Sequence, residues 1–348
     1  MIKEISMFEN KGSYGKYTRI WALISCVMMA ALLMSGCGQA QESKVYRVGV
    51  LSGLDAFSPA IDGLKTKMTE LGYVEGKNIS YDVQKTNVDI EAYKSIAKKF
   101  VDDKVDMIFV FPTEASMEVK AATQGTNIPM VFALSFTDVK GINLINSIRE
   151  PGGNVTGVRF PSVDIASKRL DILLEMVPDA KQIFVPYLKG YPNVPGQLDA
   201  IRSQAQSRGI SLIEFGATSP QDLQAELDSL VTPDGKTVDA LLLIAEPLGL
   251  TPDFFTVLGK FSSEHQIPIG GAPMVVGDYA SIFGLLPDAK TTGEQAALLA
   301  DKVLKGTAAG TIPVTTADGY FLINYKAAQE LGVNVPEGLL KQADEIIR

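Results

Sequence analysis

From residue 45 onward, the chain alternates between two patterns of apolar and polar positions. The segments VDMIFVF at 105–111 and IPMVFAL at 128–134 are almost continuously apolar, which is typical of strands buried on both faces. In residues 90–100 the apolar positions recur three and four residues apart, which indicates an amphipathic helix. Strands alternating with helices predict a parallel sheet covered by helices.

The alternation runs through the chain twice. The first half predicts strands at 45–52, 78–83, 105–111 and 128–134, with helices at 59–71, 90–100 and 114–123. The second half predicts helices at 163–176, 197–208, 220–230 and 252–265, with strands at 182–187, 211–215, 240–244 and 268–270. Strands at 280–286 and 320–324 and helices at 291–305, 325–331 and 337–347 are expected to complete both sheets. We therefore predict an α/β protein with two doubly wound, Rossmann-like lobes.

A separate apolar run of 15 residues, 20–34, precedes this region and follows Lys11, Lys16 and Arg19. The run is short for a transmembrane helix and is typical of the apolar part of an export signal. An uncleaved membrane anchor is the alternative.

The end of this run resembles a bacterial lipoprotein signal. Small residues at 35 and 36 suit a peptidase, and Cys37 offers a thiol for lipid attachment, although Met34 stands where such signals usually carry Leu. We expect residues 1–36 to be removed, Cys37 to be lipidated and residues 37–44 to form a tether. The protein would then be anchored to the outer face of the cytoplasmic membrane.

Composition excludes several functions. Residues 1–36 contain four basic and two acidic residues, so their removal takes the net charge from −8 to −10, and an acidic surface repels nucleic acid. Cys26 lies inside the signal, so no disulfide is expected after processing. A lone His265 cannot build a His-rich zinc site, and neither a G-x-S-x-G motif nor a complete phosphate-binding loop occurs. We expect no metal, no cofactor and no enzymatic activity.

Four sequence segments carry a family resemblance to the ABC-transporter substrate-binding lipoproteins of the amino-acid-type group. They are GYVEGKN at 72–78, IPMVFAL at 128–134 followed by Thr137 and Asp138, PGGNVTGV at 151–158 and INYKAAQELGVNVPEGLLKQADEII at 323–347. The resemblance spans residues 45–347. It implies the periplasmic-binding-protein type I fold, in which three crossovers join two lobes that enclose a ligand. Members with assigned ligands bind amino acids, aromatic ones among them, but most members have no assigned ligand, so the resemblance does not transfer a specific ligand.

Mapped onto this chain, that fold predicts crossovers near 154–158, 280–286 and 313–321. The first lobe would contain residues 45–157 and 285–315, and the second would contain 158–284 and 316–348. Gly152, Gly153 and Gly157 lie between the two alternating halves and are candidate hinge residues, because glycine tolerates the backbone angles that a hinge passes through. A rigid turn that uses the same glycines is the alternative.

Open parallel sheets bind ligands at the carboxyl ends of their strands. The loops there contain residues that could bind an amino acid through charge-assisted hydrogen bonds. Hydroxyl groups and helix amides would bind its carboxylate, Glu246 or Asp138 its ammonium group, and Phe57 or Tyr191 its side chain. The candidate ligand residues are Ser52, Phe57, Ser58, Thr113, Glu114, Ser135, Thr137, Asp138, Tyr191, Asn193, Glu246 and Ala272. The alternative makes Ser58 and Thr113 helix N-caps and Asp138 a turn residue.

We therefore expect a monomeric, lipid-anchored receptor that captures a small solute between two lobes and delivers it to an ABC permease. Closure would follow from a ligand that touches both lobes and stabilises the closed form. A receptor of the same fold that reports to a chemoreceptor or sensor kinase is the alternative. An exported hydrolase is a more remote one.

Overall fold

Two mainly parallel β-sheets form the framework of the computed structural model, which describes residues 44–232 and 235–348. The predicted signal, the lipidation site Cys37 and all but the last residue of the tether lie outside the described residues. The two sheets belong to one unit, residues 45–348.

The first sheet has the strand order β15-β5-β4-β3-β1-β2, and all its pairings are parallel. Every residue of β3 and β4 is buried, as their apolar sequences predicted. The strands are β1 (Tyr46–Ser52), β2 (Ile79–Lys85), β3 (Met107–Phe111), β4 (Met130–Ser135), β5 (Val155–Arg159) and β15 (Thr315–Thr316).

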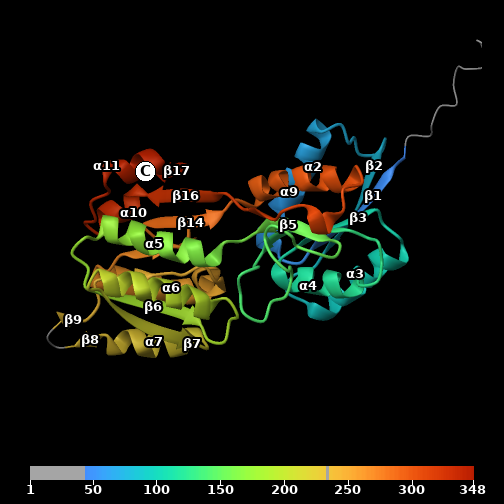
Figure 1. Cartoon of the computed structure of the whole chain (residues 1–348). Coiled ribbons are helices and arrows are strands. Elements are labelled where there is room, and N and C mark those ends of the chain that lie inside the picture. Colours follow the sequence, from blue (N-terminus) through green and yellow to red (C-terminus); the bar gives the residue numbers. More distant parts are fainter. Residues whose placement is uncertain (1–43, 233–234) are drawn as a thin grey trace, which may run out of the picture. The chain divides into compact units, whose positions relative to one another are not determined.

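Four helices cover this sheet. Figure 1 shows α2 (Pro59–Glu70) beside α9 (Ala289–Leu304), while α3 (Ile90–Asp102) and α4 (Thr113–Ala122) contribute to a separate core cluster. Glycines let α2 and α9 approach closely, because a Cβ at Gly63 would lie 1.9 Å from the carbonyl oxygen of Lys290. The helix α9 therefore returns late in the sequence to complete the first lobe.

The second sheet has the order β17-β16-β14-β11-β10-β6-β7, and only the β14–β16 pairing among these strands is antiparallel. Its strands are β6 (Gln182–Leu188), β7 (Ser211–Ala217), β10 (Ala240–Leu242), β11 (Ile269–Gly271), β14 (Phe283–Pro287), β16 (Gly319–Asn324) and β17 (Glu345–Ile347). Its helices are α5 (Ser162–Met176), α6 (Val194–Ser207), α7 (Pro220–Ser229), α8 (Pro252–His265), α10 (Tyr325–Glu330) and α11 (Glu337–Gln342).

Short elements complete the chain. These are the 3₁₀ helices η1 (Asp55–Phe57), η2 (Pro247–Leu250) and η3 (Ala309–Thr311), and two small hairpins formed by β8 (Val231–Thr232) with β9 (Gly235–Lys236) and by β12 (Val275–Val276) with β13 (Tyr279–Ala280).

The chain passes between the two sheets three times: from β5 to α5, from β14 to α9 and from β15 to β16. This topology confirms the predicted α/β fold with two doubly wound lobes and three crossovers. Within the described residues, no helix combines the length and apolar character needed to span a bilayer.

The predicted helix at 337–347 is wrong in its second half. The helix α11 ends at Gln342, and the following residues form strand β17 beside β16. Asp344 starts this pairing, because its amide donates to the Phe321 carbonyl oxygen and its carboxylate accepts from the Phe321 amide, both at 2.8 Å. The β-branched residues Ile346 and Ile347 then continue the ladder.

Candidate functional site

Three predicted hydroxyl residues lie together at the carboxyl edge of the first sheet. Ser52 and Ser135 end β1 and β4 and are fully buried, and Thr113 begins α4 with 2% of its surface exposed. The Thr113 hydroxyl accepts a hydrogen bond from the amide of Phe136 at 2.9 Å. The Ser135 hydroxyl is 2.9 Å from that of Ser116. These bonds join the end of β4 to the start of α4.

The predicted N-cap alternative holds in part. Ser58 occupies the N-cap position of α2 but makes no side-chain capping bond, and Thr113 is the first residue of α4, whose N-cap position is taken by Pro112. The Ser58 hydroxyl lies 3.2 Å from the Ser52 hydroxyl, and that of Thr113 is bonded to the next loop. Both hydroxyl groups therefore form hydrogen bonds with other residues at the carboxyl edge of the first sheet.

An irregularity in β4 shapes this edge. The β4–β5 pairing shifts register between Ala133 and Ser135, and Leu134 between them has a positive φ of 49°. Such a bulge re-aims the residues that follow it. Phe136 then packs edge-to-face with Phe160, with ring centroids 5.4 Å apart. The sequence did not single out this aromatic pair.

The remaining uncharged candidates of the first edge differ in environment. Phe57 is half-buried and packs against the main core cluster. The Thr137 hydroxyl is buried and has no hydrogen-bond partner among the described residues. An unpaired buried hydroxyl costs free energy, so it marks a place where a ligand would find a partner.

The two acidic residues of this edge, Glu114 and Asp138, differ in their environments. Glu114 occupies the first turn of α4 and is half-buried. Asp138 forms an ion pair of 3.5 Å with Arg159, which also contacts Asp164 at 3.2 Å and the hydroxyl of Thr316 at 3.0 Å. Because Asp138 already faces a guanidinium, it is a weaker candidate for a ligand ammonium than Glu246.

Glu246 lies at the carboxyl edge of the second sheet, where the chain leaves β10. It is 6% exposed, and the amide of Leu188 donates to its carboxylate at 3.3 Å. Burial raises its pKa to about 7, although amide hydrogen bonds from Leu248 and Leu188 and the charge of Arg169 oppose this rise. The carboxylate is therefore poised to gain or lose a proton near neutral pH.

Asn193 contacts the residue before Glu246 and is 1% exposed. Its side-chain nitrogen donates to the carbonyl oxygen of Ala245 at 2.9 Å, and its side-chain oxygen is buried without a hydrogen-bond partner in the described part of the chain. The side chain of Gln197 also contacts Ala245. Two side chains at the start of α6 thus hold the residue before Glu246 in place.

Tyr191 connects the two edges electrostatically. Its pKa is raised, first by burial and then by the negative charges of Glu114 from the first lobe and Glu246 from the second. Its ring packs against the main core cluster. The neutral phenol of Tyr191 is a candidate for contact with a ligand side chain.

Ala272 follows β11 and is 1% exposed within the core cluster of the second lobe. Its carbonyl oxygen accepts a hydrogen bond from the Ser281 hydroxyl at 2.5 Å. Its methyl group therefore packs in the core, although its backbone lies at the predicted edge.

The candidate hinge glycines have specific steric roles. Gly152 and Gly153 have positive φ angles of 77° and 57° and precede β5. Gly157 lies within β5, where a Cβ would come 2.3 Å from the Phe132 carbonyl oxygen. The positive φ angles and the close approach at Gly157 explain why glycine occupies these three positions. Their role as a hinge stays a prediction.

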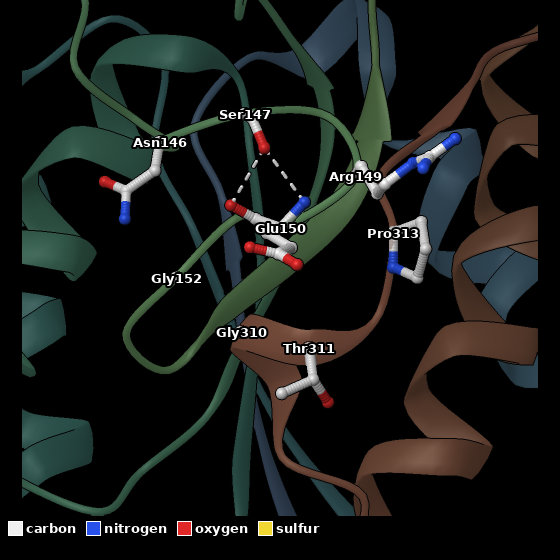
Figure 2. A pocket seen from close by; sticks show the side chains of 8 residues that line it. All are labelled: Asn146, Ser147, Arg149, Glu150, Gly152, Gly310, Thr311 and Pro313. Carbon is white, nitrogen blue, oxygen red and sulfur yellow. Dashed lines mark hydrogen bonds between the residues drawn. The ribbon is translucent and has the colours of Figure 1, made fainter.

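A pocket of about 510 Å³ lies at the opposite, amino-terminal edge of the first sheet, between the loop before β5 and η3. In Figure 2 the Ser147 hydroxyl bridges the backbone of Glu150, accepting from its amide at 2.9 Å and donating to its carbonyl at 3.1 Å. Of the predicted site residues, only Gly152 lines this pocket. The pocket is therefore separate from the candidate ligand site.

Sequence reasoning missed two buried polar residues of α5. Arg169 of α5 is 1% exposed, and the buried Ser162 hydroxyl at the start of that helix has no hydrogen-bond partner among the described residues. In the sequence, both occupy polar positions of an ordinary amphipathic helix. In the described part of the chain, no group of three or more His, Cys, Asp or Glu residues is arranged for a metal ion.

Comparisons with known proteins agree with the fold. A family model described as ABC transporter substrate binding protein matches residues 47–347. A tyrosine-binding protein of Clostridioides difficile (strain R20291) is 28% identical over 320 residues, covering 87% of this chain and 89% of the relative.

Solved structures share the fold. One is the ligand-free, open structure of a substrate-binding protein with adhesive properties from Clostridium difficile, with 25% identity, a TM-score of 0.72 and coverage of 87% of this chain and 99% of that one. Another is a domain from Streptococcus pneumoniae in complex with L-Trp, with 22% identity, a TM-score of 0.71 and coverage of 87% and 100%.

Proposed function

This chain belongs to the family of ABC transporter substrate-binding proteins, and from that premise we propose that its ligand is an aromatic amino acid. Members of the family bind solutes outside the cytoplasm for an ABC importer. The ligand proposal is supported by the tyrosine-binding relative and by the residues at the two sheet edges.

The observation that carries the proposal is the buried carboxylate of Glu246. It is 6% exposed and is held by backbone amides, and none of the described Lys, Arg or His residues forms an ion pair with it. Arg169 acts on Glu246 only through its charge, so a ligand ammonium group would supply a direct ion-pair partner, and such a bond is strong in a dehydrated site. Asp138 lacks this property because of its ion pair with Arg159.

The other groups of an amino acid have suitable partners as well. The first edge offers the unpartnered hydroxyl of Thr137 and the hydroxyl of Ser58 as hydrogen-bond donors for a carboxylate. Tyr191, Phe57 and Phe136 are aromatic residues of the two edges, and aromatic rings prefer offset or edge-to-face contacts with one another. A ligand that touches both lobes in this way would stabilise the closed form.

Binding and release would be the whole chemistry of this protein. We propose that it acts as a monomer, that Cys37 carries the lipid anchor and that the closed form docks on a membrane permease. Several acyl chains make an anchor stable, since each buried methylene contributes about 0.8 kcal/mol.

A thermal-shift screen of the purified protein tests the ligand class. The panel should contain the aromatic amino acids, aliphatic and charged amino acids, and sugars. At a concentration one hundred times the dissociation constant, a ligand stabilises the native state by about 2.7 kcal/mol. We expect the largest shifts with L-tyrosine, L-phenylalanine or L-tryptophan. Shifts confined to sugars or to aliphatic amino acids would contradict the proposal.

A further inference from the structure

Arg169 is a fully buried arginine whose hydrogen bonds all go to backbone carbonyl groups. It lies in α5 and is 1% exposed. Its Nε and Nη2 donate to the Leu285 carbonyl oxygen at 3.0 and 2.7 Å, and its Nη1 donates to the Leu243 carbonyl oxygen at 2.9 Å. The guanidinium therefore links two separate segments of the second sheet.

These two segments flank β11 in the sheet order. Leu285 lies in β14, and Leu243 directly follows β10. Between them, Gly271 ends β11, and a Cβ there would lie 2.2 Å from the Leu243 carbonyl oxygen and 3.3 Å from Cδ of Arg169. The glycine thus leaves room for the link from β10 to β14, at the carboxyl edge where the ligand residues lie.

The hydrogen bonds from Arg169 to the Leu243 and Leu285 carbonyl oxygens require donors, but they do not require a positive charge. Burying an unpaired guanidinium is costly, and burial lowers the pKa of Arg169 to about 9. The charge that opposes this decrease is that of Glu246, three residues beyond Leu243. Arg169 in turn lowers the pKa of Glu246. Each buried charge therefore offsets a part of the cost of burying the other.

We propose that Arg169 is a positioning residue of the ligand site: it fixes the segment from Leu243 to Glu246 and keeps Glu246 in the carboxylate form that pairs with the ligand's ammonium group. The amides of Leu188 and Leu248 donate to Glu246, Arg169 from α5 acts on it through its charge, and Glu246 in turn raises the pKa of the Tyr191 phenol before α6. Among them, Arg169 carries the positive charge. The ligand's part in this inference rests on the proposed function.

The test is a double-mutant cycle with Arg169→Gln, Arg169→Lys and Glu246→Gln, with L-tyrosine as the probe. Dissociation constants are measured by calorimetry from pH 6 to 8.5, and circular dichroism confirms folding. Arg169→Gln should weaken binding roughly tenfold at pH 7 and move the midpoint of the pH profile upward. Arg169→Lys keeps the charge, so its midpoint should stay near that of the wild type. Arg202→Lys, at a half-exposed arginine paired with Glu214, is the control.

In the Glu246→Gln background, Arg169→Gln should change the affinity less than about threefold, because its target is gone. An equal loss in both backgrounds, or an unchanged pH midpoint, would overturn the proposal.

If wild-type protein does not bind L-tyrosine, the ligand proposal fails, but the action of Arg169 remains testable. The ¹³C resonance of the Glu246 carboxyl group, assigned by its loss in Glu246→Gln, is then titrated in the free protein. The inference requires a higher pKa in Arg169→Gln than in the wild type or in Arg169→Lys. Equal values in all three proteins would refute it.

Discussion

The side-chain amide of Gln197 forms two hydrogen bonds with the backbone of Ala245: its Oε1 accepts from the amide nitrogen at 2.7 Å, and its Nε2 donates to the carbonyl oxygen at 3.1 Å. This pairing imitates a neighbouring strand and holds the chain at the residue before Glu246. A side chain of α6 therefore fixes a backbone position of the candidate ligand site.

We predict that Gln197→Ala weakens amino-acid binding and lowers the free energy of unfolding. The change leaves the buried amide of Ala245 without its partner, which costs about 1 to 3 kcal/mol. Chemical denaturation measures the stability and calorimetry measures the affinity. Gln206→Ala, on the exposed side of the same helix, should change neither quantity. Equal behaviour of the two variants would contradict this role of Gln197.

Glu246 predicts a specific pH dependence of ligand affinity. Its pKa in the free protein is raised to about 7, and pairing with an ammonium group requires the ionised form. Affinity should therefore fall about tenfold per unit as the pH drops below 7 and should level off above about pH 8. The Glu246→Gln variant should bind more weakly by about 2 to 5 kcal/mol and lose this dependence. A wild-type affinity that is constant from pH 5.5 to 8.5 would remove Glu246 from the site.

Gly157 gives a prediction about stability. A Cβ at this position would lie 2.3 Å from the Phe132 carbonyl oxygen, which belongs to the paired strand β4 and cannot move alone. Gly157→Ala should therefore destabilise the protein by about 2 kcal/mol or more. Gly196→Ala is the matched control, because Gly196 lies within α6 and the nearest atom to an added Cβ is Cγ2 of Val163 in α5, at 3.5 Å, and alanine favours a helix. Similar melting temperatures for both variants would contradict the steric argument.

Cys37 gives a prediction about location. Cys37→Ser should remove the attachment point for lipid, so that the exported protein no longer sediments with membranes. Cell fractionation with metabolic labelling by a fatty acid measures both effects. Retention of the Cys37→Ser variant in the membrane fraction would instead favour an uncleaved apolar anchor at residues 20–34.

The sequence predicted the alternating elements well because their patterns are local. The nearly continuous apolar runs of β3 and β4 are visible without any partner strand. The sequence predicted a helix where strand β17 lies. Tertiary contacts decide the pairing of β17 with β16, and they override the local helix preference. The sequence did not predict strand β5, because its segment contains glycine and resembles a loop. The steric need for glycine at position 157 is visible only in the structure, where Phe132 lies beside it.

The site was predictable to the level of loops. The rule that ligands bind at carboxyl ends of strands selected Thr113, Ser135 and Glu246, and the structure places all three at such edges. Arg169 and Gln197 were missed because a polar residue on a helix usually faces solvent. Their burial depends on carbonyl groups 48 to 116 residues away in the sequence.

Calorimetric titration of the purified protein with L-tyrosine at pH 8, beside tyramine and 3-(4-hydroxyphenyl)propanoate, tests the central claim most directly. Tyramine lacks the carboxylate and the propanoate lacks the ammonium group. We predict saturable one-to-one binding of L-tyrosine and an affinity at least tenfold weaker for each analogue, because each leaves one buried partner unpaired. Absence of L-tyrosine binding, or equal affinity for all three compounds, would contradict the assignment of this protein as a receptor for an aromatic amino acid.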